Sequence, residues 1–276
     1  MTALPPSIVE RQPALFVPHG APTFALRPGA AGAALASYAL SLATPRAIVV
    51  VSAHWETARA TVGTASRFDT IHDFHGFSDE LYALRYPASG CPEAAAEVMA
   101  ALGSAGLVVD ADAARGLDHG AWVPLRLMYP DADVPVVPLS LPSHEGPAGA
   151  LRLGAALEPL RARGLLVLTS GNLTHNLADY LAVARNPQPT PPYVRAFADW
   201  IWERIGARDV VGLVDYRRRA PGALRAHPTE EHLLPLFVAL GAAGERFDAR
   251  CIHAGVDDFV LAMDAFEFSG PATRRD

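Results

Sequence analysis

An apolar run that ends on a histidine constrains the fold of this chain more than any other feature. Residues 48–55 read IVVVSAHW and lie between Pro45 and Glu56. A mostly apolar run of this length is typical of a strand that is buried on both faces of a parallel sheet. The sequence therefore predicts a buried strand at 47–52 that places His54 at its carboxyl end.

The same arrangement of a strand followed by a histidine recurs twice. Residues 13–17 lead into His19, and residues 165–169 lead through a polar turn to His175. Parallel strands share their carboxyl ends, and open α/β sheets bind ligands just beyond that edge. If the strands are parallel, we expect His19, His54 and His175 to converge on one crevice.

Three imidazoles in one crevice predict a metal site. Imidazole nitrogen is a suitable ligand for zinc, iron, copper and nickel. Cys91 and Cys251 are the only cysteines in the sequence. A closed structural zinc site built on a cysteine cluster is therefore not expected, and an open catalytic site fits better.

The remaining hydrophobic pattern predicts helices that alternate with strands. We expect helices at 30–43, 78–84, 92–104, 125–128, 147–162 and 193–206, and further strands at 107–109, 134–141 and 259–268. Two prolines in the 134–141 strand place it near an edge of the sheet, because proline cannot donate to a ladder. The predicted fold is a single α/β domain whose central, largely parallel or mixed sheet is flanked by helices and carries the metal site at the carboxyl ends of its strands.

Residues 227–235 predict one more helix start. Thr229 is a suitable N-cap, with Glu230 and Glu231 in the first turn and His232 at its end. The positive end of a helix dipole disfavours imidazolium, so His232 is expected to be neutral and able to bind metal.

Composition limits the kind of protein. The 276 residues are 50% hydrophobic and carry a net charge of -6, and no linker or repeat divides them, so residues 1–276 are expected to form one domain with a core at about 13–268. The 23 basic residues are scattered, which argues against a nucleic-acid partner. No signal peptide and no apolar run of about 20 residues is recognised, so we expect no membrane association and a cytoplasmic location.

Common catalytic motifs of other classes are absent from the sequence. We find no Gly-x-Gly-x-x-Gly, Walker A, Gly-x-Ser-x-Gly or His-Glu-x-x-His motif. Ser52 and Ser170 lie near histidines, but neither has the sequence context of a nucleophile elbow. A serine hydrolase is therefore disfavoured.

Six short motifs occur together, in order, between about residues 13 and 268. They are PHG at 18–20, VVSAHW at 50–55, TIHDF at 70–74, LDHGAW at 117–122, SGN at 170–172 with HN at 175–176, and PT at 228–229 with EH at 231–232. Together they resemble the class III extradiol ring-cleavage dioxygenases, in particular the branch of DOPA 4,5-dioxygenase-like proteins. The resemblance implies an α/β domain that holds one non-haem metal ion.

The resemblance also implies roles for individual histidines. It makes His19, His54 and His232 the metal ligands and His175 the acid/base catalyst above the metal. His119 resembles a catalytic residue that lines the substrate pocket.

Further residues are implied as substrate or supporting residues, namely His72, Asp73, Trp55 and Asn172. The third metal ligand departs from the usual pattern, because the two-histidine, one-carboxylate triad of non-haem iron oxygenases expects an acid there. Glu231 is the adjacent alternative to His232, and His227 is a weaker one.

The implied reaction is the opening of a catechol ring by O2. Fe(II) is expected in the active enzyme, although such a site can also hold Zn(II). The substrate would be L-DOPA or a related catechol, and the product a muconic semialdehyde, with the position of cleavage left open. A zinc-dependent hydrolase and a non-catalytic metal-binding relative remain as alternatives, and the chain could be a monomer or a small homo-oligomer.

Overall fold

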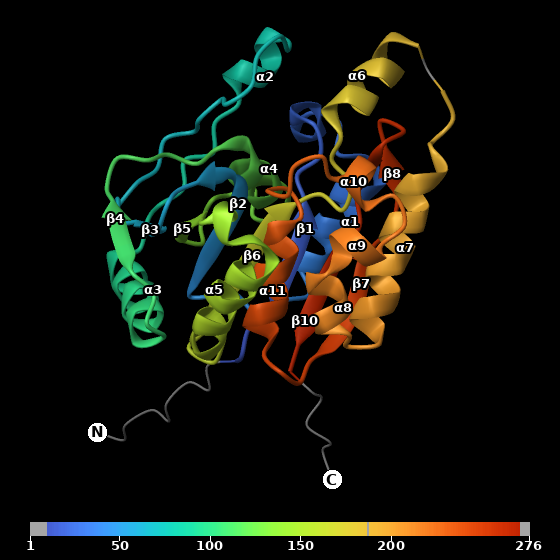
Figure 1. The fold of residues 1–276 in the computed structure, drawn as a ribbon. Helices are drawn as coiled ribbons and strands as arrows, with labels where there is room; N and C mark the ends of the chain where they lie inside the picture. The colour runs from blue at the N-terminus through green and yellow to red at the C-terminus, as the bar shows by residue number, and fades with distance from the viewer. Residues whose placement is uncertain (1–9, 187, 271–276) are drawn as a thin grey trace, which may run out of the picture.

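An eight-stranded mixed sheet forms the centre of the molecule in the computed structural model, which describes residues 10–186 and 188–270 (Figure 1). Its strand order is β4-β3-β5-β2-β6-β1-β10-β7. The strands are β1 (Ala14–Pro18), β2 (Ala47–Glu56), β3 (Ala60–Gly63), β4 (Val109–Asp112), β5 (Val136–Leu141), β6 (Leu165–Gly171), β7 (Asp248–His253) and β10 (Ala265–Ser269). A separate two-stranded hairpin consists of β8 (Val256–Asp257) and β9 (Leu261–Ala262).

The four central strands β5, β2, β6 and β1 are mutually parallel. β3 runs antiparallel to β5, and β10 runs antiparallel to both β1 and β7. The carboxyl ends of β1, β2 and β6 therefore lie at the same edge of the sheet, as the strand-and-histidine pattern predicts.

The predicted edge position of the 134–141 strand is wrong, because β5 lies between β3 and β2. Pro138 is tolerated there because it faces Gly63 of β3, where a side chain would collide with its ring. The β3–β5 pairing is limited to Val62 and Leu139, so Pro138 interrupts little of a ladder on that side.

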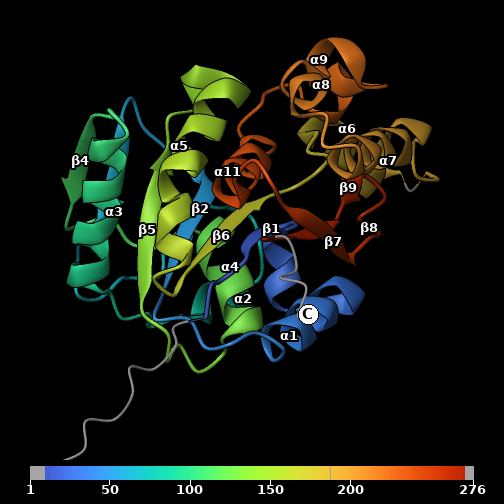
Figure 2. The same cartoon turned by 90° about the horizontal axis from the view of Figure 1, so that it is seen from below.

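Helices cover both faces of the sheet, and Figure 2 shows α5 and α11 on one side and α1 and α4 on the other. Alternate residues along the strands divide between two cores: Phe16 and Val49 face α5 and α11, whereas Leu15 and Val50 face α1 and α4. The helices are η1 (Pro22–Ala25), α1 (Gly29–Ala39), α2 (Asp79–Ala83), α3 (Pro92–Ser104), α4 (His119–Met128), η2 (Ser143–Glu145), α5 (Gly146–Arg161), α6 (Leu177–Arg185), α7 (Pro192–Gly206), α8 (Val210–Val214), α9 (Tyr216–Arg219), α10 (Ala223–Ala226) and α11 (Leu234–Ala243). The described residues thus form a single α/β domain, and none of its helices is long and apolar enough to cross a membrane.

A buried arginine holds the amino ends of the strands together. The Arg161 guanidinium is fully buried and donates to the main-chain carbonyls of Gln12, Ala242, Ala243 and Phe268. These carbonyls belong to segments before β1, at the end of α11 and in β10. One side chain therefore joins three parts of the chain at the end of the sheet opposite to the carboxyl ends.

Candidate metal centre

Four histidines meet at the carboxyl end of the central strands. His19 follows β1 directly, and His54 lies in the last part of β2. His175 comes just before α6, and His232 precedes α11 by two residues. The three histidines predicted from strand ends are therefore brought together, and His232 joins them from a separate segment.

A β-bulge at the end of β2 places His54. Val51 pairs with Leu139 and Glu56 pairs with Leu141, so β2 advances five residues while β5 advances two. The surplus residues leave the ladder, and a bulge of this kind redirects the side chains that it contains. His54 consequently points toward the other histidines.

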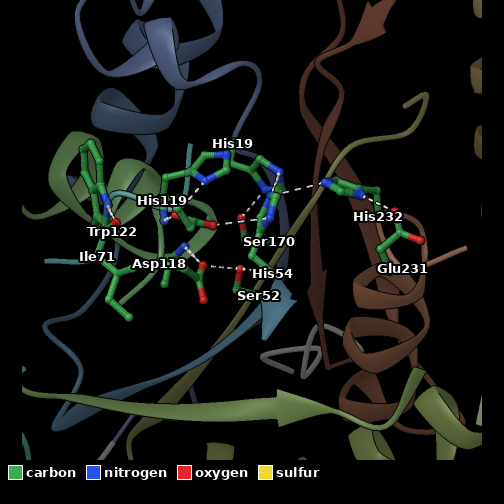
Figure 3. A network of polar contacts seen from close by, with 12 residues as sticks. His19, Ser52, His54, Ile71, Asp118, His119, Trp122, Ser170, Glu231 and His232 are labelled. Atoms are coloured by element: carbon green, nitrogen blue, oxygen red, sulfur yellow. Dashed lines mark hydrogen bonds and ion pairs between the residues drawn. The ribbon is translucent and has the colours of Figure 1, made fainter. Parts of the chain in front are cut away.

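The imidazole Nε2 atoms of three histidines converge (Figure 3). The Nε2 atom of His54 lies 3.2 Å from that of His19 and 3.3 Å from that of His232. Two nitrogens bound to one metal at about 2.1 Å are separated by about 3.0–3.4 Å. Both distances from His54 are therefore those expected between two ligands of a single ion.

An oxygen atom lies near the second nitrogen of each of these imidazoles, and those of His19 and His232 are within hydrogen-bond distance. His19 Nδ1 lies 2.9 Å from Ser170 Oγ, His54 Nδ1 lies 3.5 Å from Asp73 Oδ2, and His232 Nδ1 lies 2.9 Å from Glu231 Oε1. Metal-binding histidines usually have such a partner, which fixes the ring orientation and leaves the opposite nitrogen for the metal. All three rings are therefore oriented with Nε2 toward the common centre.

The surroundings keep these imidazoles neutral. Burial, reinforced by the neighbouring histidines, holds the pKa of His19 and of His232 well below the ordinary value of 6.5. Burial and the adjacent His119 lower the pKa of His54 to about 4. A neutral imidazole keeps the lone pair that a metal requires, so this donor set fits a divalent transition metal.

His175 lies directly against His232. The two rings are stacked with centroids 3.4 Å apart and an angle of 6° between their planes. The main-chain NH of His175 donates to the carbonyl of Ala226, and the next residue, Asn176, caps α6 by accepting from Asp179. Burial lowers the pKa of His175 to about 4, so this ring is also neutral near pH 7.

His119 is the first residue of α4, and a carboxylate fixes its position. Asp73 Oδ1 accepts from the main-chain NH of His119 at 2.9 Å and lies 3.0 Å from its Nδ1 atom. Although burial raises the pKa of Asp73, the hydrogen bonds from His119 lower it to about 2. Asp73 is therefore ionised, and its two oxygens reach His119 and His54.

The histidines form the floor of a cavity of about 430 Å³. Its walls are mostly apolar, a combination that is typical of sites for small organic ligands. α2 and α6 stand on either side of this end of the molecule in Figure 1. The cavity is lined by His19, Gly20, Ala21, Pro22, His54, Asp73, Phe74, His75, Phe77, His119, His175, Asn176, Leu177, Tyr180, Glu231, His232 and Leu261.

Comparison with known proteins assigns this site to a family. Residues 31–256 match the model of the catalytic LigB subunit of aromatic ring-opening dioxygenase. The chain belongs to this family. It is a class III extradiol ring-cleavage dioxygenase, as the six sequence motifs predict.

Curated relatives and a solved structure agree with this assignment. The dioxygenase is 40% identical over 231 residues to 4,5-DOPA dioxygenase extradiol of Beta vulgaris, and the matched region covers 82% of this chain and 83% of the relative. It is 38% identical over 236 residues to the protein of the same name from Escherichia coli K12, covering 84% and 85%. The crystal structure of an uncharacterized protein of Escherichia coli K12 superposes with a TM-score of 0.77 at 32% identity, covering 93% and 99% of the two chains. The family and the histidine cluster together indicate a metal cofactor, a small-molecule substrate and O2.

Three further residues singled out from the sequence lie outside the cavity of the dioxygenase. His72 Nε2 lies 3.1 Å from the carbonyl of Leu84, and its ring packs against aromatic neighbours. Trp55 is buried with the Arg115 guanidinium over its ring. Asn172 is fully buried and accepts from the main-chain NH of Gly20, which joins the ends of β6 and β1 beside His19.

The two alternatives to His232 have other partners. His227 is fully buried, and its Nε2 atom lies 2.8 Å from the carbonyl of Leu173, outside the cavity lining. Glu231 lines the cavity, but its Oε1 atom contacts the Nδ1 atom of His232. In this arrangement Glu231 orients His232.

The predicted helix start at Thr229 is wrong, because α11 begins only at Leu234. The Thr229 hydroxyl donates to Glu231 instead of capping a helix. His232 is held by its own carbonyl, which accepts from the main-chain NH of Asn172 at 3.0 Å. The close approach requires Gly171, where a Cβ atom would lie 2.2 Å from the carbonyl oxygen of His232.

Sequence reasoning missed two kinds of residue in this dioxygenase. Ser170 was considered only as a nucleophile, whereas its hydroxyl contacts His19, a role that its place at the end of the β6 pattern could have indicated. Phe74, Phe77 and Tyr180 supply much of the apolar wall. The density of aromatic residues in the 70–77 loop was a signal for the first two.

Proposed function

We propose that this chain is an Fe(II)-dependent extradiol dioxygenase whose metal is held by His19, His54 and His232 and whose substrate is L-DOPA or a related catechol. The observation that carries the proposal is the approach of the Nε2 atoms of His19 and His232 to that of His54, with the Nδ1 atoms of His19 and His232 held by Ser170 and Glu231. Neutral imidazoles can also hold Zn(II), so zinc in a purified sample is compatible with the proposal.

A bound Fe(II) ion supplies the Lewis acidity and the redox chemistry that joining O2 to an aromatic ring requires. The protein contributes the shape and dryness of the cavity. The apolar side chains of Phe74, Phe77 and Leu261 contact the aromatic ring and exclude water from it. The histidine floor then receives the two hydroxyl groups.

His175 and His119 are placed to move protons. Among the described residues, the His175 ring makes no hydrogen bond, and its neutral nitrogens are free to accept a proton from a catechol hydroxyl and later return it. His119 Nδ1 is engaged by Asp73, so Nε2 is the atom that remains for the substrate. His175 thus serves as the acid/base catalyst and His119 as a hydrogen-bonding catalytic residue of the pocket.

The overall reaction follows from these roles. The ring bond that breaks lies beside the pair of hydroxyl-bearing carbons, and both atoms of O2 enter the product as aldehyde and carboxylate oxygens. The product is a yellow muconic semialdehyde.

Metal content and oxygen uptake test the proposal together. Protein loaded anaerobically with Fe(II) should consume O2 when L-DOPA or a simple catechol is added. His54→Ala should lose both metal and turnover, whereas His175→Ala should lose turnover but keep one metal per chain. His144→Ala removes an exposed histidine that does not line the metal-centre cavity and serves as the control. Full metal content in His54→Ala would refute the assignment of ligands.

A further inference from the structure

A second cavity adjoins the metal centre. It has a volume of about 270 Å³ and shares Gly20 and Ala21 with the larger cavity. Its remaining lining comes from η1, the start of α1 and the β8–β9 hairpin, with the residues Thr23, Phe24, Arg27, Gly29, Asp257, Asp258 and Met263. The two cavities therefore lie on the same Gly20–Ala21 turn that follows β1.

The two cavities differ in their charged residues. Apart from histidines, the charged side chains that line the metal-centre cavity are Asp73 and Glu231, both of which contact histidines. The second cavity contains a cation, Arg27, and two carboxylates. Among the described residues, the Arg27 guanidinium forms no hydrogen bond and no ion pair, so its donors are available to a ligand.

The carboxylate of Asp258 is presented by a strained turn. Asp258 has φ 48° and Phe259 has φ 63°, both in the left-handed region. This conformation is easy for Asp but costly for Phe, and such strain gathers at ligand sites. The side chain of Phe259 is 46% exposed, so burial of this ring does not account for the conformation of the turn.

Tyr180 connects the two sets of residues. It lines the metal-centre cavity. Burial raises its pKa, and so does the charge of Asp258, while the charge of Arg27 lowers it. Both charges therefore act on a side chain at the wall of the first cavity, although Arg27 and Asp258 do not pair with each other within 4.0 Å.

We propose that the second cavity is a subsite for the α-amino acid end of the substrate, in which Arg27 binds the carboxylate and Asp258 binds the ammonium group. Among the described residues, neither Arg27 nor Asp258 has an ion-pair partner, and a cation and a carboxylate beside a ring-sized apolar cavity match a zwitterion attached to a catechol ring. The inference rests on the proposed function and narrows it to catechols that carry an amino acid group.

Four catechols separate the contributions of the two charges. L-DOPA carries both groups, 3-(3,4-dihydroxyphenyl)propionate carries only the carboxylate, dopamine carries only the ammonium, and 4-methylcatechol carries neither. Oxygen uptake by the Fe(II)-loaded protein gives kcat/KM for each. Arg27→Gln should lower the selectivity for the propionate over 4-methylcatechol about tenfold, the effect expected for one partly solvated, charge-assisted hydrogen bond.

Asp258→Asn supplies the opposite test. Asn adopts the left-handed region readily, so the turn is retained while the charge is removed. This variant should lower the selectivity for dopamine over 4-methylcatechol about tenfold. Arg218→Gln, an equivalent change at an exposed arginine of α9, is the matched control and should leave every selectivity at the wild-type value.

The outcomes are distinguishable from failure of the proposed function. Turnover of 4-methylcatechol with no change of selectivity in either variant would overturn the subsite and leave the dioxygenase proposal intact. If no catechol consumes O2, the proposed function fails. Calorimetric binding of the propionate still tests the subsite in that case, with about tenfold weaker binding expected in Arg27→Gln and equal binding overturning it.

Discussion

Gly171→Ala should damage the metal centre without touching a metal-binding side chain. Gly171 is the last residue of β6, and a Cβ atom there would lie 2.2 Å from the carbonyl oxygen of His232. The same oxygen accepts the main-chain hydrogen bond from Asn172. The added methyl group therefore presses on the backbone that positions His232, and no flexible side chain can yield.

The structure sets the size of this effect. An unstrained carbon–oxygen contact is about 1 Å longer than the 2.2 Å available, so the main chain at His232 must retreat by about that distance. A metal site tolerates ligand displacements of about 0.5 Å. We expect metal affinity to fall about 10- to 100-fold and the free energy of unfolding to fall by about 1–3 kcal/mol.

Metal stoichiometry after dialysis against a graded chelator series measures the affinity, and urea unfolding measures the stability. Gly103→Ala is the matched control, because Gly103 lies in α3 with nothing within 4 Å of an added Cβ atom. Alanine should be neutral or stabilising there by about 0.5–1 kcal/mol. Wild-type metal affinity in Gly171→Ala would show that the His232 backbone is not held in the way described.

Three other predictions concern stability. Burial lowers the pKa of His227 from 6.5 to about 4, so on acidification the unfolded chain binds a proton at this residue before the folded chain does. The free energy of unfolding of the metal-free protein should therefore fall by about 3 kcal/mol between pH 6.5 and 4 through this group. Urea unfolding should show a flatter pH dependence in His227→Gln. Arg161→Met should cost about 3 kcal/mol because it leaves buried carbonyls unpaired, whereas Arg163→Met at an exposed ion pair should cost less than about 1 kcal/mol in the same assay. Gly154→Ala should lower the melting temperature, because the added Cβ atom would lie 2.0 Å from the carbonyl oxygen of Val238 and push α5 away from α11. The expected cost in the free energy of unfolding is about 1–3 kcal/mol. An unchanged melting temperature would contradict the packing described.

The parallel core of the fold could be predicted from the sequence because its strands are continuous apolar runs. The helices at 92–104, 147–162 and 193–206 agree closely with α3, α5 and α7. β3 and β7 were missed, since both are short or half-exposed and lack such a run. The 259–268 segment was predicted as one strand but is divided into β9 and β10, because pairing with different partners overrides its uniform apolar pattern.

Residues of the candidate site could be placed from the sequence only where they directly follow a strand, because the strand then fixes where they lie. His19, His54 and His175 follow strands, and the parallel sheet brings them together. His232 follows no strand; the helix-start pattern indicated that it could bind metal, but only the family resemblance grouped it with His19 and His54. Its placement depends on a long-range contact between its carbonyl and the end of β6, and local sequence patterns carry no information about such contacts.

The bulge that ends β2 divides this strand into a part that pairs within the sheet and a part that carries His54. Up to Val51 the residues are fixed in register with β5 and β6 by the buried core. Beyond it, Ser52 still pairs with Ser170 of β6, whereas the residues that carry His54 have left the ladder with β5. Redesign of residues 53–55 should consequently alter the metal centre while the sheet keeps its register, so reactivity can be changed at this short segment independently of folding.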